Sequence, residues 1–379
     1  MNRGRSGIVS LLNFFKAKKV IKSWSEKSIV IFSEGNVYNT TNKPVIDELV
    51  KEIAVLYITI DKDDELLSYN HEKFHSVYLE FDFWGQTLMA TIKGNLFLTA
   101  TYSLEVLSLK KSKFMKYYIC MLHSSTDLQA GQKYSFDYFD SVICFTKAQL
   151  QTLQELEQVR KSSIKDKPLL GLAYYDVYDE LNNNIDVEEN YKYVLVAPSW
   201  GSNNFLNYID FDIFECIFQA GYNVIFRPHP MSLTYETELL SKIKSKYING
   251  YNGLKFEIDT DNVAIKSIKK SLCLISACSG FVIDYVMFAN KGLILFNNER
   301  KIDNLDQIDL PARTFWDEQV VEDIARFVKT KEEFNDALTY CIDKQADIGS
   351  KISKYRNEII NFGNASVHIA KYCIEKYNL

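Results

Sequence analysis

The sequence predicts an α/β fold in two domains, each built on a parallel sheet with helices on both faces. Short apolar runs rich in β-branched residues alternate with segments of helical spacing along the chain. Its 379 residues exceed what one hydrophobic core usually supports. The most polar interior stretch, 181–190, is the best linker candidate. We therefore predict domains at 28–182 and 191–330, preceded by a basic segment at 1–27 and followed by helices at 331–379 that pack back.

Composition narrows the class of protein. Hydrophobic residues make up 47% and charged residues 25%, an ordinary globular mixture, and the net charge of −5 argues against a nucleic-acid partner. The seven cysteines are scattered, without Cys-x-x-Cys spacing, which indicates reduced core residues rather than a metal or redox site. No apolar run approaches the roughly 18 to 20 residues that cross a bilayer. We expect a cytoplasmic protein without a bound metal or cofactor.

The amino-terminal segment 1–27 differs from the rest because it carries seven basic side chains and one acid, Glu26. One helical face would hold Ile8, Leu11, Leu12 and Phe15, a pattern that suits an anchor on an anionic membrane. Lys19 and Lys22 fall on the same face, so an ordinary packing helix is the alternative. A signal peptide fits poorly, because the lysines follow the apolar stretch.

The first domain should begin with a strand, a loop at Ser33 to Gly35 and a helix. The acidic stretch 61–65 is more typical of a solvated turn than of a metal site. Expected strands lie at 29–32, 55–60, 77–79, 96–99, 117–122, 141–145 and 169–173, with helices at 42–53 and from 148.

The strand ending at Leu122 leads directly into His123, Ser124, Ser125 and Thr126. A buried strand therefore delivers a histidine, with hydroxyl groups beside it, to its carboxyl end. The alternative is that a serine caps a helix and His123 only packs.

The second domain repeats the alternation and contains the stretch Arg227-Pro228-His229-Pro230. Two prolines after the apolar strand end forbid both continuation of the strand and an immediate helix. The resulting loop holds an arginine, suited to phosphate oxygens, and a histidine at an edge where α/β sheets bind ligands. Expected strands lie at 193–197, 222–226, 254–258, 271–275 and 292–296, with helices at 211–219, 239–247, 262–269 and 281–289.

A second candidate site follows the strand at 271–275. The stretch Ser276-Ala277-Cys278-Ser279-Gly280 precedes a helix that carries Asp284. Backbone N–H groups, serine hydroxyls and the positive end of a helix together favour an anion. Serine and glycine also occur in tight connections that bind nothing.

These motifs, in this order, resemble the CDP-glycerol glycerophosphotransferase family of teichoic acid and capsule polymerases. The stretches that carry the resemblance are 117–125, 194–201, 224–231 and 274–297. The resemblance implies a GT-B fold, in which two Rossmann-like domains face a central cleft and the second holds the nucleotide. It also implies peripheral attachment to the inner face of a bacterial membrane, where lipid-linked acceptors reside.

On this resemblance, we expect transfer of glycerol phosphate, or a similar polyol phosphate, from a CDP-activated donor to a hydroxyl of a glycan or lipid-linked acceptor, releasing CMP. His123 would be the general base, and His229 with Arg227 would stabilise charge on the phosphates. The other expected donor-binding residues are Ser199, Trp200, Gly201, Ser276, Ser279, Gly280 and Asp284. His123, His229 and Ser279 should then face one cavity.

Two positions depart from the family pattern. Ala277 stands where an aspartate is usual, and Ser124 follows His123 where a glycine is common. Two alternatives therefore stay open. One is a GT-B glycosyltransferase that uses a UDP- or CMP-sugar, and the other is a weakly active nucleotide-binding subunit of a surface-polysaccharide complex.

Overall fold

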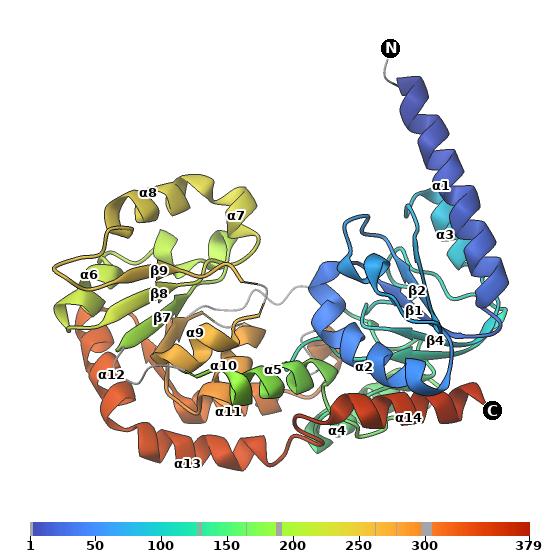
Figure 1. The fold of residues 1–379 in the computed structure, drawn as a ribbon. Coiled ribbons are helices and arrows are strands. Elements are labelled where there is room, and N and C mark those ends of the chain that lie inside the picture. The colour runs from blue at the N-terminus through green and yellow to red at the C-terminus, as the bar shows by residue number, and fades with distance from the viewer. Residues whose placement is uncertain are drawn as a thin grey trace. The chain divides into compact units, whose positions relative to one another are not determined.

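The computed structural model describes residues 3–126, 128, 131–163, 165–186, 192–261, 263–277, 279–296 and 305–379, with side chains from residue 13 onward. This part of the chain forms two compact units (Figure 1). Unit 1 contains the chain up to Val177 and two returning segments, 305–313 and Ile359–Leu379. Unit 2 runs from Tyr178 to 296 and includes Thr314–Glu358.

Unit 1 is built on a parallel six-stranded sheet in the order β3-β2-β1-β4-β5-β6. Every residue of β1 and β2 is buried, which is typical of strands covered by helices on both faces. The strands are β1 (Ile29–Ser33), β2 (Val55–Thr59), β3 (Phe74–Tyr78), β4 (Gly94–Thr99), β5 (Met115–Cys120) and β6 (Ser141–Val142). The helices are α1 (Arg3–Trp24), α2 (Asn39–Glu52), α3 (Phe83–Met89), α4 (Lys147–Arg160) and α14 (Ala365–Tyr377), with the short turns η1 (Asn36–Tyr38), η2 (Glu65–Ser68) and η6 (Asp306–Asp309).

Unit 2 has a second parallel six-stranded sheet, in the order β12-β11-β10-β7-β8-β9. Its strands are β7 (Tyr193–Ala197), β8 (Asn223–Phe226), β9 (Phe256–Ile258), β10 (Ser271–Ser276), β11 (Leu293–Phe296) and β12 (Ala325–Val328). Its helices are α6 (Ile213–Gln219), α7 (Ser232–Tyr235), α8 (Thr237–Tyr247), α9 (Ile265–Lys270), α10 (Gly280–Ala289), α11 (Trp316–Ile324), α12 (Lys331–Asp343) and α13 (Gln345–Arg356), with η4 (Gly201–Asn203) and η5 (Phe205–Asn207).

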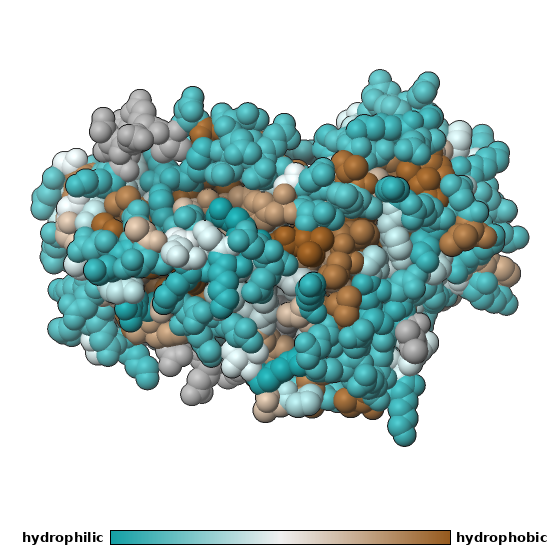
Figure 2. All heavy atoms as spheres, turned by 90° about the horizontal axis from the view of Figure 1, so that it is seen from below, coloured by the Kyte–Doolittle hydropathy of each residue, from teal (hydrophilic) through white to brown (hydrophobic). Residues whose placement is uncertain are grey.

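Each sheet has its own hydrophobic core. In unit 1 the helices α2 and α14 pack together and contribute Leu49 and Ile369 to the cluster around β1 and β2. In unit 2 the cluster joins Ile217 of α6 and Phe334 of α12 to β7, β8 and β10. The face shown in Figure 2 is hydrophilic over most of its area, with apolar residues in separate patches. Most apolar side chains of the strands are thus held inside the two cores.

The cysteines of the described chain are reduced and lie in these cores, as the sequence predicts. Buried free thiols are present at Cys120, Cys144, Cys216, Cys273, Cys341 and Cys373. Cys278 lies outside the described residues. Burial raises the pKa of the Cys120 and Cys273 thiols well above the usual value, so these groups stay protonated.

The segment 305–313 belongs to unit 1 although it lies between two strands of unit 2 in the sequence. The guanidinium of Arg160 on α4 attaches it, with Nη2 2.6 Å from Asp306 and Nε 2.9 Å from Asp309. The same side chain also pairs with Asp137 at 2.7 Å. The Arg160 side chain is more than four-fifths buried, so these ion pairs hold the segment firmly against α4.

The predicted strand at 169–173 is wrong. Leu169 forms only an isolated bridge with Cys144, and Gly171 has a φ of +98°, which ends the extended conformation. Ala173 then opens the helix α5 (Ala173–Asn184), which enters the polar stretch expected to be a linker. The chain passes from unit 1 to unit 2 within this helix, after Val177, while residues 187–190 of the expected linker lie outside the described chain.

Candidate functional site

A cavity of about 280 Å³ lies at the carboxyl ends of three adjacent strands of unit 2, β7, β8 and β10. This is the edge at which open α/β sheets bind ligands. Its lining includes the predicted site residues Ser199, Arg227, His229, Ser279 and Gly280, with Pro198, Pro228, Pro230 and Phe281. The fold therefore brings together loops that are some eighty residues apart in sequence.

His229 is held in one tautomer by its own loop. Its Nδ1 accepts a hydrogen bond of 3.1 Å from the backbone N–H of Met231. In the neutral ring the hydrogen must then be on Nε2, which makes that atom a donor. Burial lowers the pKa of His229 below its usual 6.5, and the Glu236 carboxylate partly opposes this shift. The imidazole is thus neutral at pH 7 and presents an N–H group.

Arg227 is positioned by an acid of the neighbouring loop. Its Nη1 lies 2.7 Å from the Asp259 carboxylate, and its Nη2 donates to the Asp261 carbonyl at 2.6 Å. The guanidinium also lies over the Phe281 ring, 5.9 Å from the centroid. Its charge is therefore partly offset by Asp259, and its direction is fixed before any ligand arrives.

The two serines around Ala277 have different environments. Ser276 is fully buried and donates to the Ala197 carbonyl at 2.6 Å, so its hydroxyl joins β10 to β7 and is not part of the cavity lining. Ser279 lines the cavity as the N-cap of α10, and its hydroxyl makes no capping bond there. Ala277 is fully buried in the core cluster of unit 2, where an aspartate would be desolvated.

The loop after β7 presents an aromatic surface beside His229. The Trp200 ring is 42% exposed and stacks 6.1 Å from both the His229 and the Tyr235 rings. Gly201, at a φ of +65°, donates its N–H to the Glu236 carboxylate at 3.2 Å. Trp200 is therefore a half-exposed platform whose following turn is fixed to the α7–α8 junction.

Asp284 is half-buried on α10 and is not among the residues that line the cavity. It acts instead on Tyr178, whose pKa is raised mainly by burial and next by the Asp284 charge. Its absence from the lining fits an indirect role better than a direct contact with a ligand.

His123 lies in unit 1, shortly after the end of β5 at Cys120, and its ring contacts three neighbours. Its Nδ1 lies 2.6 Å from the Ala100 carbonyl oxygen, which can only accept, so Nδ1 carries the hydrogen. The Tyr102 ring stacks on it at 4.4 Å, and the Tyr38 ring meets its edge at 4.8 Å. Burial lowers its pKa, partly opposed by the bond to Ala100. The neutral ring therefore has its lone pair on Nε2.

Sequence reasoning missed Tyr38, Tyr102 and Asp259. The signal for Tyr38 was Gly35, which follows a buried strand and has a φ of +121° in the structure. Tyr102 and Asp259 follow β4 and β9, and nothing in their sequence context marks them.

The acidic stretch 61–65 was expected to be a solvated turn, and most of it is exposed, although Asp64 is buried and the stretch is also bonded to a neighbouring turn. Asn36 of η1 donates to Asp61 at 3.4 Å and to the Asp63 carbonyl at 2.9 Å, and it accepts from the Glu65 N–H at 2.9 Å. The stretch thus fixes the turn after β1. No group of three side chains suited to a metal ion occurs in the part of the chain that the structure describes.

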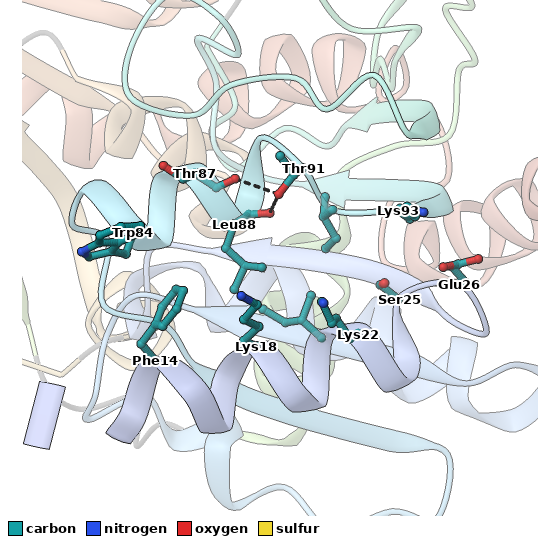
Figure 3. Close-up of a pocket in the computed structure, with 12 residues that line it drawn as sticks. Phe14, Lys18, Lys22, Ser25, Glu26, Trp84, Thr87, Leu88, Thr91 and Lys93 are labelled. Carbon is teal, nitrogen blue, oxygen red and sulfur yellow. Dashed lines mark hydrogen bonds between the residues drawn. The ribbon is translucent and has the colours of Figure 1, made fainter. Parts of the chain in front are cut away.

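Another cavity, of about 520 Å³, lies in unit 1 between α1 and α3 (Figure 3). Its lining combines the apolar side chains Phe14, Ile21, Trp84, Leu88 and Ile92 with the ammonium groups of Lys18, Lys22 and Lys93. Ala17 and Ile21 are buried, while Phe15 and Trp84 are 55% and 59% exposed. The predicted apolar face falls largely on Ile8, Leu11 and Leu12, whose side chains lie outside the described ones.

No family model and no curated protein sequence matches the chain. Solved structures do match it. The wall teichoic acid polymerase TagF superposes with a TM-score of 0.62 at 16% identity, covering 100% of this chain and 98% of that one. A TagF variant soaked with CDPG gives 0.59 at 14% identity, with the same coverage. The UDP-GlcNAc 2-epimerase of Methanocaldococcus jannaschii gives 0.52 at 14% identity, covering 92% of this chain and 99% of that one.

These likenesses and the two parallel sheets confirm the predicted fold class, α/β of the GT-B type. They also confirm, at the level of fold, the resemblance to teichoic acid polymerases. Among the helices that the structure describes, none is both long and apolar enough to pass through a bilayer.

Proposed function

We propose that this protein transfers glycerol phosphate, or a similar polyol phosphate, from a CDP-activated donor to a hydroxyl of a cell-surface glycan or polymer. One observation carries the proposal. The two strand-end histidines have opposite hydrogen bonding at Nδ1, which makes Nε2 of His123 an acceptor and Nε2 of His229 a donor. Phosphoryl transfer needs one group of each kind, a base for the attacking hydroxyl and a donor for the phosphate charge.

In the proposed reaction His123 Nε2 takes the proton of the acceptor hydroxyl. The acceptor oxygen then bonds to the phosphorus of the polyol phosphate, and the bond from this phosphorus to the bridging oxygen breaks. CMP leaves with the electron pair of the broken bond. His229 Nε2–H donates a hydrogen bond to the phosphate oxygens on which charge develops.

The cavity of unit 2 suits the nucleotide donor. Arg227, oriented by Asp259, supplies positive charge, and Ser279 with the first backbone amides of α10 supplies hydrogen-bond donors for phosphate oxygens. We assign Trp200 and its neighbours Ser199 and Gly201 to the nucleoside side, because an exposed indole offers a stacking surface for a base. Ser276 and Asp284 are assigned supporting roles behind this lining.

The proposal is tested with CDP-glycerol and a glycerol phosphate oligomer as acceptor, following CMP release. His123→Ala and His229→Ala should each lower kcat by about 10²-fold or more, since each removes a group that acts on a reacting atom. His368→Ala, on the helix α14, is the matched control and should keep the parent rate. If both site variants turn over CDP-glycerol like the parent, the assignment of the histidines is wrong.

A donor panel separates the proposal from a glycosyltransferase reaction. The folds of nucleotide-sugar proteins such as the UDP-GlcNAc 2-epimerase also match this chain, so UDP- and CMP-sugars belong in the panel. Mass spectrometry of the acceptor decides the outcome: a gain that contains phosphate supports polyol-phosphate transfer, and a plain sugar supports the alternative. Nucleotide binding by calorimetry without release of CMP or UDP from any donor would indicate a binding subunit.

We propose as well that unit 1 attaches to an anionic membrane surface through the groove between α1 and α3. Its lining holds three lysines against one acid, Glu26, and the exposed Trp84, which contacts the exposed Phe83 ring. It thus combines charge complementary to lipid phosphates with aromatic rings suited to the interface. Figure 1 shows the first turns of α1 standing away from the rest of unit 1, so this helix end is accessible within the unit. Such attachment would bring the site to lipid-linked acceptors.

Charge variants test this attachment without removing the helix, whose Ala17 and Ile21 are part of the buried interior. Lys18→Gln with Lys22→Gln should reduce sedimentation with phosphatidylglycerol vesicles severalfold, because each lysine near an anionic surface contributes about 1 kcal/mol. Lys242→Gln with Lys244→Gln, on α8 of unit 2, is the matched control. Equal sedimentation of all three proteins, or binding to phosphatidylcholine vesicles alone, would contradict the proposal.

A further inference from the structure

The environment of His123 is built from the ends of three strands of the unit 1 sheet. Ala100 and Tyr102 follow β4, His123 follows β5, and Tyr38 belongs to η1 after β1. Because β1, β4 and β5 are consecutive in the sheet, their carboxyl ends meet at one edge. Besides the Nδ1 bond to Ala100, the backbone N–H of His123 donates to the Tyr102 hydroxyl at 3.2 Å. Two neighbours thus hold the ring from the β4 side.

Tyr38 contacts His123 from a different element, η1, and several interactions fix the position of this turn. An added Cβ at Gly35 would collide with Asp61, and the φ of +121° there is strained for any other residue. Asn36 is bonded to Asp61, to the Asp63 carbonyl and to the Glu65 N–H. These bonds determine where η1 begins and therefore where the Tyr38 ring lies.

The hydroxyl of Tyr38 donates to the Glu34 carboxylate at 3.3 Å. Burial, and next the Glu34 charge, raise the pKa of Tyr38 to about 12. The phenol therefore stays protonated at neutral pH and remains tethered to Glu34 rather than acting as an acid or base. Tyr38 thus contacts His123 through its ring, with the two centroids 4.8 Å apart and the ring planes at 84°.

We infer that Tyr38 is a positioning residue for His123: its ring packs against the imidazole, which also stacks on Tyr102, and so leaves Nε2 as the atom that meets the acceptor hydroxyl. The inference rests on the proposed function of His123 as general base. Among the described residues, no hydrogen bond to Nε2 is formed. The acidic stretch 61–65 then has a function, since it holds the turn that carries Tyr38.

The ionisation of His123 should depend on the Tyr38 ring. The titratable groups around His123 are Tyr38, which is bonded to Glu34, and Tyr102, which has Cys120 near it. Burial is the cause that lowers the His123 pKa, so removal of the Tyr38 ring should admit water and raise that pKa toward 6.5. A base must be unprotonated to act, and the acid limb of the rate profile should then move to higher pH.

Tyr38→Ala should lower kcat about tenfold, with KM for the donor unchanged, because the base is displaced and the donor site is not. Its acid limb should lie at higher pH than that of the parent protein. Tyr38→Phe keeps the ring and should retain the parent limb and most of kcat. Glu34→Gln keeps an acceptor for the phenol but removes the charge. It should leave the acid limb of the rate profile at the parent pH, because burial sets the His123 pKa.

The same variants are followed by NMR titration of the imidazole nitrogens, assigned by loss of signals in His123→Ala. Tyr38→Ala should raise the His123 pKa, whereas Tyr38→Phe should not. An unchanged His123 titration in Tyr38→Ala would overturn the inference even if the enzyme is active. Lack of turnover by the parent protein would instead contradict the proposed function, and the NMR result would still decide whether Tyr38 positions the ring.

Discussion

The sites around His123 and His229 are alike in place and different in environment. Each histidine follows a buried strand of a parallel sheet, and burial lowers the pKa of each. In unit 1 the Nδ1 atom faces the Ala100 carbonyl, and the ring is packed against two tyrosines. In unit 2 the Nδ1 atom accepts from the Met231 N–H, beside a half-exposed tryptophan and an ion-paired arginine.

The difference teaches that the chemical role of a histidine is decided by the partner of its second nitrogen. His229 obtains that partner two residues away, within the turn that Pro228 and Pro230 impose. His123 obtains it from a neighbouring strand end. The first arrangement depends on a local turn, whereas the second depends on the whole sheet edge.

Glutamine substitutions should separate the two roles most strongly. A glutamine amide can donate near the position of Nε2 but cannot accept a proton as a base. His123→Gln should therefore lose about 10²-fold or more in kcat, as much as His123→Ala. His229→Gln should keep several times the activity of His229→Ala, because a donor remains. Steady-state CMP release by the four variants measures both ratios.

Equal losses in His229→Gln and His229→Ala would contradict the donor role of His229. Retention of activity by His123→Gln would contradict the role of His123 as a base. Unfolding curves of all four variants serve as the control, because a lost fold would reduce both activities without regard to the tautomer.

The charged pair of unit 2 gives a second contrast with the aromatic enclosure of His123. Arg227 and Asp259 are 16% and 11% exposed, and Asp259 also accepts from Ser267 at 2.6 Å. Asp259→Ala would leave a mostly buried guanidinium without its partner, and it should lower the free energy of unfolding by about 3 kcal/mol. Denaturant unfolding followed by tryptophan fluorescence measures this loss.

Glu238→Ala, which breaks the exposed pair with Lys242, is the matched control and should leave the unfolding midpoint unchanged. If Asp259→Ala behaves like this control, the pair does not hold Arg227, and the guanidinium is free to move toward a ligand.

The sequence predicted the fold because the apolar runs and their turns alternate clearly in both halves. Both histidines were found for the same reason, since each lies within three residues of the end of such a run. The prolines around His229 further marked its loop as rigid. A local pattern was therefore enough for the strands and for what lies at their ends. The expectation that His123 faces the cavity of His229 and Ser279 stays a prediction.

Contacts between distant segments could not be predicted from such patterns. Tyr38 and His123 are brought together by the order of β1, β4 and β5, and Arg227 meets Asp259 only because β8 pairs with β9. The segment 305–313 joins unit 1 through Arg160, although strands of unit 2 flank it in sequence. The first two contacts depend on which strands are neighbours in the sheet, and all three join segments that are far apart in the chain. Patterns in a single sequence do not show which distant segments meet.

Within one loop, the sequence likewise did not show which of Ser276 and Ser279 faces the cavity. These two serines provide the prediction with the smallest expected effect. Both were assigned to the phosphates, yet Ser276 donates to the Ala197 carbonyl inside the sheet while Ser279 lines the cavity. Ser276→Ala should lower the free energy of unfolding by about 1 kcal/mol and leave KM for the donor unchanged.

Ser279→Ala should raise KM for the donor severalfold with little change in unfolding, because its hydroxyl makes no capping bond in the protein. Unfolding curves and donor KM values of the two variants together decide the matter. A higher KM in Ser276→Ala at unchanged stability would mean that this hydroxyl reaches the ligand after all. The binding contribution of unit 2 would then extend below the cavity into the sheet, and its contrast with the closed imidazole site of unit 1 would be weaker.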